Sequence, residues 1–397
     1  MLIEIHMLQN HAPSNLNRDD TGSPKDCIFG GVRRVRISSQ CLKRSVRVSE
    51  TMKKALTKSV LGIRSRQFPK CVNQYVFERI KGNLSEEDAK KIAEMCQVKC
   101  TGLANKEGKE SDSGEMPQTV FFSDSDVKTI GDFFLKLSGY LPETLSEVSP
   151  EKILKNLKDL KMKEIQKSQE LKTWRPITPD IALFGRMTTS DAFVDVEAST
   201  QVAHAISVNK MDQEFDFFTA VDDLQEKGTM EDAGADMMGD IEFASACFYK
   251  YFSIDCAGLV DNLTGQSKDE TTVEQAKMIA KEVIPAFIEA AVFATPSGKQ
   301  NSFAAHQLPD AILVEVKEEN IPVSYANAFL KPIVPSRDKD LSEAAIEALK
   351  TYKENIQHKY GLRISHSFWF TTKDIRIEKT IDCDTLSILL EKTKTLL

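Results

Sequence analysis

Apolar residues along the chain follow two spacings, one typical of strands and one typical of helices. Residues 2–8 are mostly apolar and predict a first strand, and residues 32–37 alternate in the manner of a second. Helical spacing begins at about Gln40 and runs into the 50s, with Leu42 and Val46 on the apolar face. The same spacing recurs in four longer stretches, at 72–100, 124–172, 272–294 and 342–358.

Further strands are predicted where short apolar runs lie between polar segments. Residues 180–187 form one such run. Residues 200–218 predict a hairpin, because His204 lies among alternating apolar residues, 209–212 offer a turn and two phenylalanines alternate on the return. Three more runs, at 243–252, 311–316 and 368–370, complete the strands. A few strands, scattered helices and long connections indicate an α+β fold.

Charge is unevenly placed along the 397 residues, of which 41% are hydrophobic and 28% charged. This is enough apolar material for two or three structural units. The formal net charge is −7, yet residues 25–70 carry 13 Lys and Arg against two acids. Residues 197–240 carry 11 acids against two Lys. A basic block in an acidic chain indicates a local site for a polyanion.

The two oppositely charged segments also offer a way for copies of the chain to assemble. A basic segment of one copy and an acidic segment of the next can pair head-to-tail, and such contacts build open filaments. A simpler interpretation is that the acidic segment repels non-specific RNA. The charge pattern leaves both open.

Motifs of the common enzyme classes are missing from the sequence: it contains no P-loop, no G-x-S-x-G, no H-E-x-x-H and no G-x-G-x-x-G. We therefore expect no catalytic residue and no cofactor. Cys96 and Cys100 are the only close cysteine pair and lack the second pair of a zinc site. His6 and His11 precede Asp19 and Asp20, which permits a metal or acid–base site, although strand and loop roles explain the same residues.

The sequence also bears on location. It has no run of roughly 18 apolar residues that could cross a bilayer. Its first residues lack the basic start and cleavage site of a signal peptide. Eight scattered cysteines suit reduced thiols, so we expect a cytoplasmic protein without membrane contact.

The densest signal for a binding site lies between Lys25 and Arg47. A Gly30-Gly31 break precedes a basic strand, and Ser38 begins a helix whose free N–H groups and positive dipole end suit phosphate. Four polar or basic residues share one face of this helix: Gln40, Lys43, Arg44 and Arg47. On the strand, Arg34 and Arg36 share a face that Arg33 does not. The pattern indicates a nucleic-acid site, with a solvated basic face as the alternative.

Longer motifs can be followed from the start of the chain to about residue 330. They are His6-x₄-His11, Pro13-Ser14-x-Leu16-Asn17-Arg18-Asp19-Asp20, Lys25-Asp26-x-Ile28-Phe29-Gly30-Gly31-x-Arg33-Arg34-Val35-Arg36-Ile37-Ser38-Ser39-Gln40, Leu42-Lys43-Arg44, Asp180-Ile181-Ala182-Leu183-x-Gly185-Arg186-Met187, Val202-Ala203-His204-Ala205-Ile206, Phe217-Phe218-Thr219-Ala220-Val221-Asp222-Asp223-Leu224-Gln225 and Ser324-Tyr325-Ala326-Asn327-Ala328-Phe329. With these motifs the chain resembles the CasC family, the backbone subunit of the type I-E CRISPR Cascade surveillance complex in the Cas-seven superfamily.

The resemblance implies an RRM-like, ferredoxin-like palm with a helical fingers insertion and a β-hairpin thumb. The expected palm segments are 1–60, 176–196 and 229–397, with fingers at 61–175 and the thumb at 197–228. We carry no role onto the loops at 104–115 and 229–240.

The resemblance also implies a function in antiviral defence. Copies of the subunit would stack head-to-tail along the CRISPR guide RNA (crRNA), hold its backbone and expose bases for pairing with a target DNA strand. The partners are then the guide RNA, the target DNA, further copies of the chain and other Cascade subunits. No enzymatic activity is expected.

Specific RNA contacts follow from the same motifs. They are Arg18, Lys25, Ser38, Gln40, Lys43, Arg44, Arg47, Met187, His204, Lys299 and Gln300. Met187 is expected beside a kinked base. Lysines of the fingers, Lys161, Lys163 and Lys167, are candidates for contact with target DNA.

Two other functions remain open at this point. Related type III backbone subunits cut bound RNA with a loop aspartate, for which Asp19 or Asp20 would be the candidate. A metabolic α+β enzyme is the other alternative, and no motif supports it.

Overall fold

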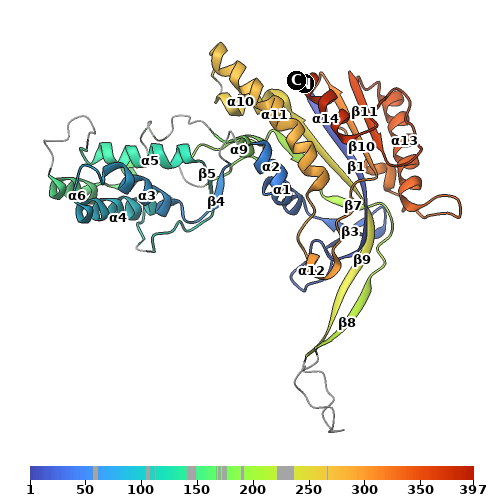
Figure 1. Cartoon of the computed structure of the whole chain (residues 1–397), viewed down its shortest axis with the longest axis horizontal. Helices are drawn as coiled ribbons and strands as arrows, with labels where there is room; N and C mark the ends of the chain where they lie inside the picture. Colours follow the sequence, from blue (N-terminus) through green and yellow to red (C-terminus); the bar gives the residue numbers. More distant parts are fainter. Residues whose placement is uncertain are drawn as a thin grey trace, which may run out of the picture. The chain divides into compact units, whose positions relative to one another are not determined.

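The computed structural model describes residues 1–56, 61–103, 108–111, 113–140, 149–166, 168, 171, 177–188, 192–220, 237–265 and 267–397. The chain divides into two compact units (Figure 1). The first, called the sheet unit here, comprises Met1–Ala55, Thr200–Cys256 and Lys281–Leu397. The second, called the helical unit, comprises Leu56–Ser199 and Ala257–Ala280.

One large, mostly antiparallel sheet organises the sheet unit. Its strands are β1 (Leu2–Ser14), β2 (Asp26–Phe29), β3 (Val32–Ile37), β6 (Thr200–Val202), β7 (Ala205–Ser207), β8 (Glu214–Ala220), β9 (Met237–Asp255), β10 (Ala311–Lys317), β11 (His366–Thr371) and β12 (Ile381–Asp382). The order is β12-β11-β10-β1-β9-β7-β3-β2, with β6 and β8 also paired to β9. Only the β11–β12 pair is parallel among the described ladders. With its helices, the sheet confirms the α+β class.

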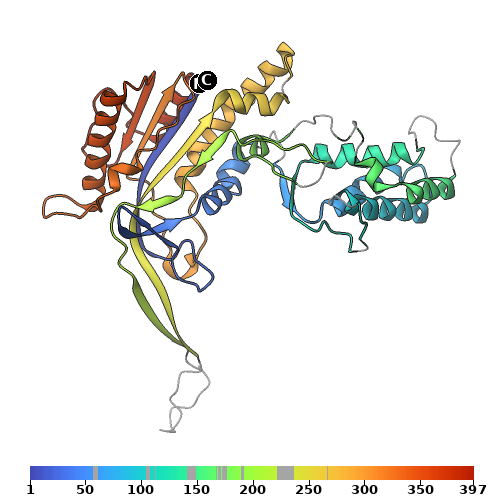
Figure 2. The ribbon, with the colours of Figure 1, turned by 180° about the vertical axis from the view of Figure 1, so that it is seen from behind.

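Helices lie against the sheet, as the views from both sides show (Figure 2). The helices of this unit are α1 (Ser39–Arg47), α2 (Glu50–Ala55), α12 (Gln300–Phe303), the 3-10 helix η1 (Ala326–Phe329), α13 (Leu341–Tyr360), α14 (Leu386–Thr395) and the second part of α11 (Glu270–Phe293), and of these α11, α13 and α14 lie beside the strands in both views. On one face, Leu8, Leu313 and Trp369 of the strands pack with Leu349 of α13. Elsewhere in the unit the Phe252 ring meets Phe287 of α11 edge-on. Buried strand residues therefore fix the sheet between helices.

The helical unit has a separate apolar core. Its elements are β4 (Ile63–Ser65), α3 (Phe68–Ile80), α4 (Glu86–Gly102), β5 (Val120–Phe122), α5 (Asp124–Leu137), α6 (Pro150–Asp159), α7 (Met162–Ile165), α9 (Pro179–Phe184), most of α10 (Cys256–Thr264) and the first part of α11. Phe68 of α3 meets both Phe122 and Phe193 edge-on in this core. The predicted helical stretch 124–172 is divided among α5, α6 and α7.

Two predicted elements are wrong. Residues 180–187 were expected to form a strand, but Pro179–Phe184 form helix α9. Proline at the first turn suits a helix start, and Ile181 to Leu183 are all buried, so a short apolar run gave no periodicity to separate helix from strand.

The predicted hairpin within 200–218 is also absent. β6, β7 and β8 each pair with β9, which is 19 residues long. Alternation shows which side chains share a face, but it does not identify the partner strand. β9 also includes residues 237–240, which were expected to lie in a loop.

Several other predictions fall partly or wholly outside the described residues. These are the loop 104–115 at 104–107 and 112, the loop 229–240 at 229–236, the end of the thumb at 221–228, and Lys167. Among the described helices, none combines the length and apolar character that a membrane crossing requires.

Candidate nucleic-acid interface

Asn17 of the sheet unit holds the two ends of the basic segment, Lys25 and Ser38, close together. Its side-chain oxygen accepts the backbone N–H of Ser38 at 2.8 Å, and its carbonyl accepts the backbone N–H of Lys25 at 2.8 Å. The Lys25 carbonyl in turn accepts the N–H of Arg36 at 2.8 Å. The loop before β2 is thereby tied to the start of α1.

Helix α1 presents a basic face without an acidic residue. Ser38 is its N-cap and accepts the N–H of Cys41, while Leu42 and Val46 are buried. Gln40 and Arg44 are exposed, and Lys43 and Arg47 are half-buried. Burial lowers the pKa of Lys43 from its ordinary value.

Lys25, Arg36 and His204 form a basic cluster beside this helix. The Arg36 Nη1 lies 3.0 Å from the His204 Nδ1, and its Nε donates to the Asp26 carbonyl at 3.2 Å. Burial first, and then the charges of Arg36 and Lys25, hold the pKa of His204 below its ordinary value. Because an arginine can only donate, neutral His204 is the acceptor in this contact.

Arg34 lies apart from that surface. It is fully buried, and its guanidinium donates to the carbonyls of Ser207, Val208, Phe329 and Leu330 at 2.8–3.2 Å. The sequence pattern grouped Arg34 with Arg36 on one strand face, but only Arg36 reaches the surface. Gly30 has a packing role too, since a side chain there would collide with the Leu330 carbonyl.

The loop at 296–304 lies against the loop that follows β1. A side chain at Gly298 would collide with the carbonyls of Asn15 and Leu16. Lys299 and Ala304 have positive φ values of 51° and 48°, a region that is uncommon for residues with a side chain. Gln300 donates to the Pro296 and Ala305 carbonyls at 3.1 and 3.4 Å, so its amide group holds the loop together. Lys299 is thereby brought near the Arg18 loop.

The same loops border an open hollow of about 480 Å³, lined from Leu16 to Gly22 and by Gly298. Asp19 turns inward to its own loop and accepts from the Thr21 N–H, the Thr21 hydroxyl and the Ser23 N–H at 2.8–3.0 Å. The Thr21 hydrogen bond is the main reason that the pKa of Asp19 is lowered. Arg18 and Asp20 are exposed at this hollow.

The long β8–β9 pair carries exposed aromatic side chains among acids. Phe215 and Phe217 are 63% and 61% exposed, on the face shared with Asp240 and Glu242. Carboxylates on this face disfavour close contact with phosphate groups.

Met187 belongs to the helical unit and is 95% exposed. It lies beside the antiparallel bridge between Arg186 and Val196. The predicted site residues are thus divided between units, and those of the sheet unit fall on the start and body of α1, the Lys25–His204 cluster, the Arg18 loop and the loop at 296–304.

The histidines expected near Asp19 and Asp20 do not assemble a metal site in the described residues. His6 and His11 are five positions apart on β1, so they lie on opposite faces of the sheet. His6 does lie with Glu4 and Glu315, a set that could hold a cation. However, Lys317 forms an ion pair with Glu4, and Lys353 lies 3.5 Å from Glu315, so ammonium groups already balance both carboxylates.

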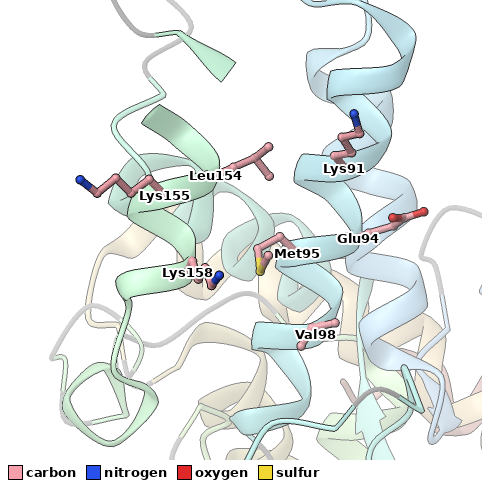
Figure 3. A pocket seen from close by; sticks show the side chains of 7 residues that line it. All are labelled: Lys91, Glu94, Met95, Val98, Leu154, Lys155 and Lys158. Carbon is pink, nitrogen blue, oxygen red and sulfur yellow. The ribbon is translucent and has the colours of Figure 1, made fainter. Parts of the chain in front are cut away.

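A groove between α4 and α6 marks the surface of the helical unit (Figure 3). It measures about 520 Å³, and Met95, Val98 and Leu154 line it. Three lysines, Lys91, Lys155 and Lys158, border it together with one acid, Glu94. Lys161 and Lys163, expected near target DNA, are exposed in the same unit.

Sequence spacing missed two residues that organise this basic surface. Arg36 was read only as part of a basic strand, and Asn17 only as part of a motif. An asparagine in the loop before β2 gives no spacing signal, because its side-chain hydrogen bond reaches Ser38, beyond the basic strand.

Comparisons with known proteins agree with this architecture. A sequence model described as CT1975-like protein matches residues 3–392. A chain from a structure titled "CRISPR RNA-guided surveillance complex, pre-nicking" has a TM-score of 0.74 and 24% identity, with full coverage of both chains. A chain from a "CRISPR RNA-guided surveillance complex" has a TM-score of 0.59 and 22% identity, covering 100% of this chain and 99% of that one. None of the curated proteins matches the chain.

Proposed function

The chain belongs to the CT1975-like protein family, as the resemblance of its motifs indicated, and we propose that it is a non-catalytic subunit of a CRISPR RNA-guided surveillance complex that binds the guide RNA along its backbone. The similar folds found in two such complexes support this role. In both, the likeness extends over the whole chain.

The observation that carries the proposal is the gathering of positive charge at the start of α1. Lys25 and Arg36 lie there beside the neutral ring of His204, and α1 adds Lys43 and Arg47 further along, without any acid of its own. Like charges held together disfavour one another unless an anion lies between them. Backbone phosphates of single-stranded RNA supply such anions, and contact with phosphates requires no particular base sequence.

The more detailed role that we propose is taken from the resemblance to the CasC family. The sheet unit corresponds to an RRM-like palm, the helical unit to fingers and the β8–β9 pair to a thumb. Copies would stack head-to-tail along the RNA in a type I-E Cascade complex, with other Cascade subunits at its ends. Met187 would contact a kinked base, and the bases left exposed would pair with the target DNA strand. Such a complex would act in the cytoplasm in antiviral defence.

The ribonuclease alternative now rests on Asp20. Three hydrogen bonds within its own loop occupy the Asp19 carboxylate, whereas the exposed Asp20 carboxylate makes neither a hydrogen bond nor an ion pair with the described part of the chain. Under our proposal, Asp20→Ala leaves RNA binding unchanged, and the wild-type protein does not cut RNA in the presence of Mg²⁺ or Mn²⁺. Cutting that disappears in Asp20→Ala would favour the ribonuclease.

Salt dependence of RNA binding tests the proposal directly. We expect Lys43→Ala with Arg47→Ala to weaken binding of single-stranded RNA and to flatten the slope of log K against log salt by about 1.4, or about 0.7 for each lost phosphate contact. Affinity would be measured by fluorescence anisotropy between about 50 and 200 mM salt.

A matched variant separates this effect from a general loss of charge. Lys359→Ala with Arg363→Ala also removes one lysine and one arginine, both exposed in the sheet unit beyond the interface. This control should keep the wild-type slope. Equal slopes for wild type and the Lys43/Arg47 variant would contradict the proposed interface.

A further inference from the structure

Met187 of the helical unit carries its exposed side chain on a backbone that is fixed on both sides. Before it, Arg186 exchanges two backbone hydrogen bonds with Val196, both of 2.8 Å. After it, the Thr188 N–H donates to the Asp195 carboxylate at 2.8 Å. The backbone of Met187 is therefore fixed on both sides, while its apolar side chain is 95% exposed.

The Arg186 side chain turns into the core. Its Nη1 donates to the Asp126 Oδ2 at 2.9 Å, its Nε donates to the Val194 carbonyl at 3.0 Å, and its guanidinium lies over the Phe193 ring. Both members of the ion pair are almost fully buried. Asp126 is itself fixed, because the same Oδ2 accepts the Ser123 N–H and hydroxyl at the start of α5.

The direction of Met187 follows from the burial of its neighbour. In extended backbone, successive side chains point to opposite sides. Because Arg186 points inward to Asp126, Met187 must point outward. Gly185, just before Arg186, lets this segment lie close to residues 196–198. Any side chain at Gly185 would collide with the Val196 carbonyl and the Ala198 backbone.

We propose that Arg186, through its buried ion pair with Asp126, is a positioning residue that presents Met187 to a nucleobase of the bound RNA. The inference rests on the proposed function. A polarizable thioether packs well against the face of an aromatic ring, and apolar side chains can separate stacked bases. Because the backbone on both sides of Met187 is already fixed, binding need order only its side chain.

A double-mutant cycle tests the link between the two residues. The full chain is titrated with single-stranded RNAs that each carry one 2-aminopurine at a successive position, since this base becomes brighter when it unstacks. Arg186→Lys keeps the charge but loses the planar fork that contacts Asp126 and Val194. We expect Arg186→Lys and Met187→Ala each to remove the fluorescence increase at the same positions and to weaken binding by about threefold to tenfold.

The double variant gives the decisive comparison. If Arg186 acts through Met187, Arg186→Lys has no further effect on fluorescence once Met187 is alanine. If the two substitutions instead reduced the fluorescence increase independently, so that their effects multiplied in the double variant, the proposal would be overturned. Asp195→Ala is a second variant that leaves the core intact, because Asp195 is exposed, and it should also reduce the fluorescence increase.

A control distinguishes positioning from a general loss of stability. Lys99→Met breaks another ion pair of the helical unit, with Glu110 at 2.7 Å. It should lower the melting temperature yet leave the fluorescence increase unchanged. Full fluorescence in Met187→Ala would overturn the positioning role while RNA binding through Lys43 and Arg47 persists. Failure of the wild-type chain to bind RNA would contradict the proposed function itself.

Discussion

The sheet unit and the helical unit differ in how they bury charge. In the sheet unit, Glu4, Glu315, Lys317 and Lys353 form a network of buried ion pairs within the core, together with the neutral ring of His6. In the helical unit, the Arg186–Asp126 pair is buried, whereas Glu110 keeps about a third of its side chain exposed in its pair with Lys99. The core of the sheet unit therefore contains several paired charges, whereas the core of the helical unit is largely apolar.

The buried charges of the sheet unit are connected to its basic surface. Buried polar groups fix a single arrangement only when each has its partners. In the sheet unit, Tyr325 hydrogen-bonds Glu315 and belongs to the segment that continues into η1, whose last carbonyls accept from Arg34. Arg34 in turn holds β3, the strand that carries Arg36. The polar core and the basic surface are thus linked through neighbouring segments.

Breaking an ion pair in each unit should give the largest contrast. Lys317→Met leaves Glu4 buried without its counter-charge, and we expect a loss of about 3–5 kcal/mol in the free energy of unfolding. Lys99→Met should cost less, about 1–2 kcal/mol, because water can still reach Glu110. Urea denaturation of both variants measures the difference. Equal losses would remove the distinction between the two cores.

Acid should destabilise the sheet unit more than the helical unit. All six histidines belong to the sheet unit, and burial lowers the pKa of His6 well below its usual value and that of His11 to about 4. The unfolded chain takes up these protons below about pH 6.5 whereas the folded unit does not, so stability present above that pH is lost as the pH falls. The loss should approach about 2.7 kcal/mol per pH unit for two protons.

Trp369 provides the measurement of this acid effect, since it is buried in the sheet unit. With Trp174→Phe, fluorescence reports Trp369 alone, because the chain has two tryptophans. The raised pKa of Glu315, caused by burial, acts in the opposite sense and reduces the slope. A Trp369 transition that is independent of pH between 7 and 5 would contradict the expectation.

The smallest expected contrast lies in two helix caps with the same hydrogen-bond pattern. Asp340 caps α13 of the sheet unit at an exposed position, and Ser123 caps α5 of the helical unit inside the core. Asp340→Ala should cost about 1 kcal/mol and Ser123→Ala about 2 kcal/mol, because Ser123 also satisfies the buried Asp126. Thermal melts would compare them. If Asp340→Ala lost more stability than Ser123→Ala, the buried cap of α5 would contribute less to stability than the exposed cap of α13, contrary to this expectation.

Several strands and helices of the sheet unit could be predicted from sequence, because the spacing of apolar residues within each one is typical of its structure. β3 was predicted from alternation, α1 from helical spacing with a capping serine, β10 from a short apolar run and α13 from helical spacing, and the structure contains all four. The apolar run at 180–187 had no such signal and proved helical.

Long-range pairing explains most of what sequence spacing missed. The partner of β8 is β9, on the far side of a long connection, rather than the nearer strands. Arg34 and Arg36 look alike in sequence, yet one is buried by carbonyls from β7 and η1 and the other reaches His204. The RNA contacts named from the family resemblance remain predictions, and the structure adds Arg36 and Asn17 to them as residues that organise the same surface.

Footprinting of lysines with and without RNA tests the central claim most directly. Lysines on the full chain would be acetylated in the presence of single-stranded RNA and in its absence, and the modified sites identified by mass spectrometry. We expect protection of Lys25, Lys43 and Lys299, with no change at the exposed Lys359. Protection confined to Lys91, Lys155 and Lys158 of the helical unit, or no protection at all, would contradict an RNA interface on the sheet unit.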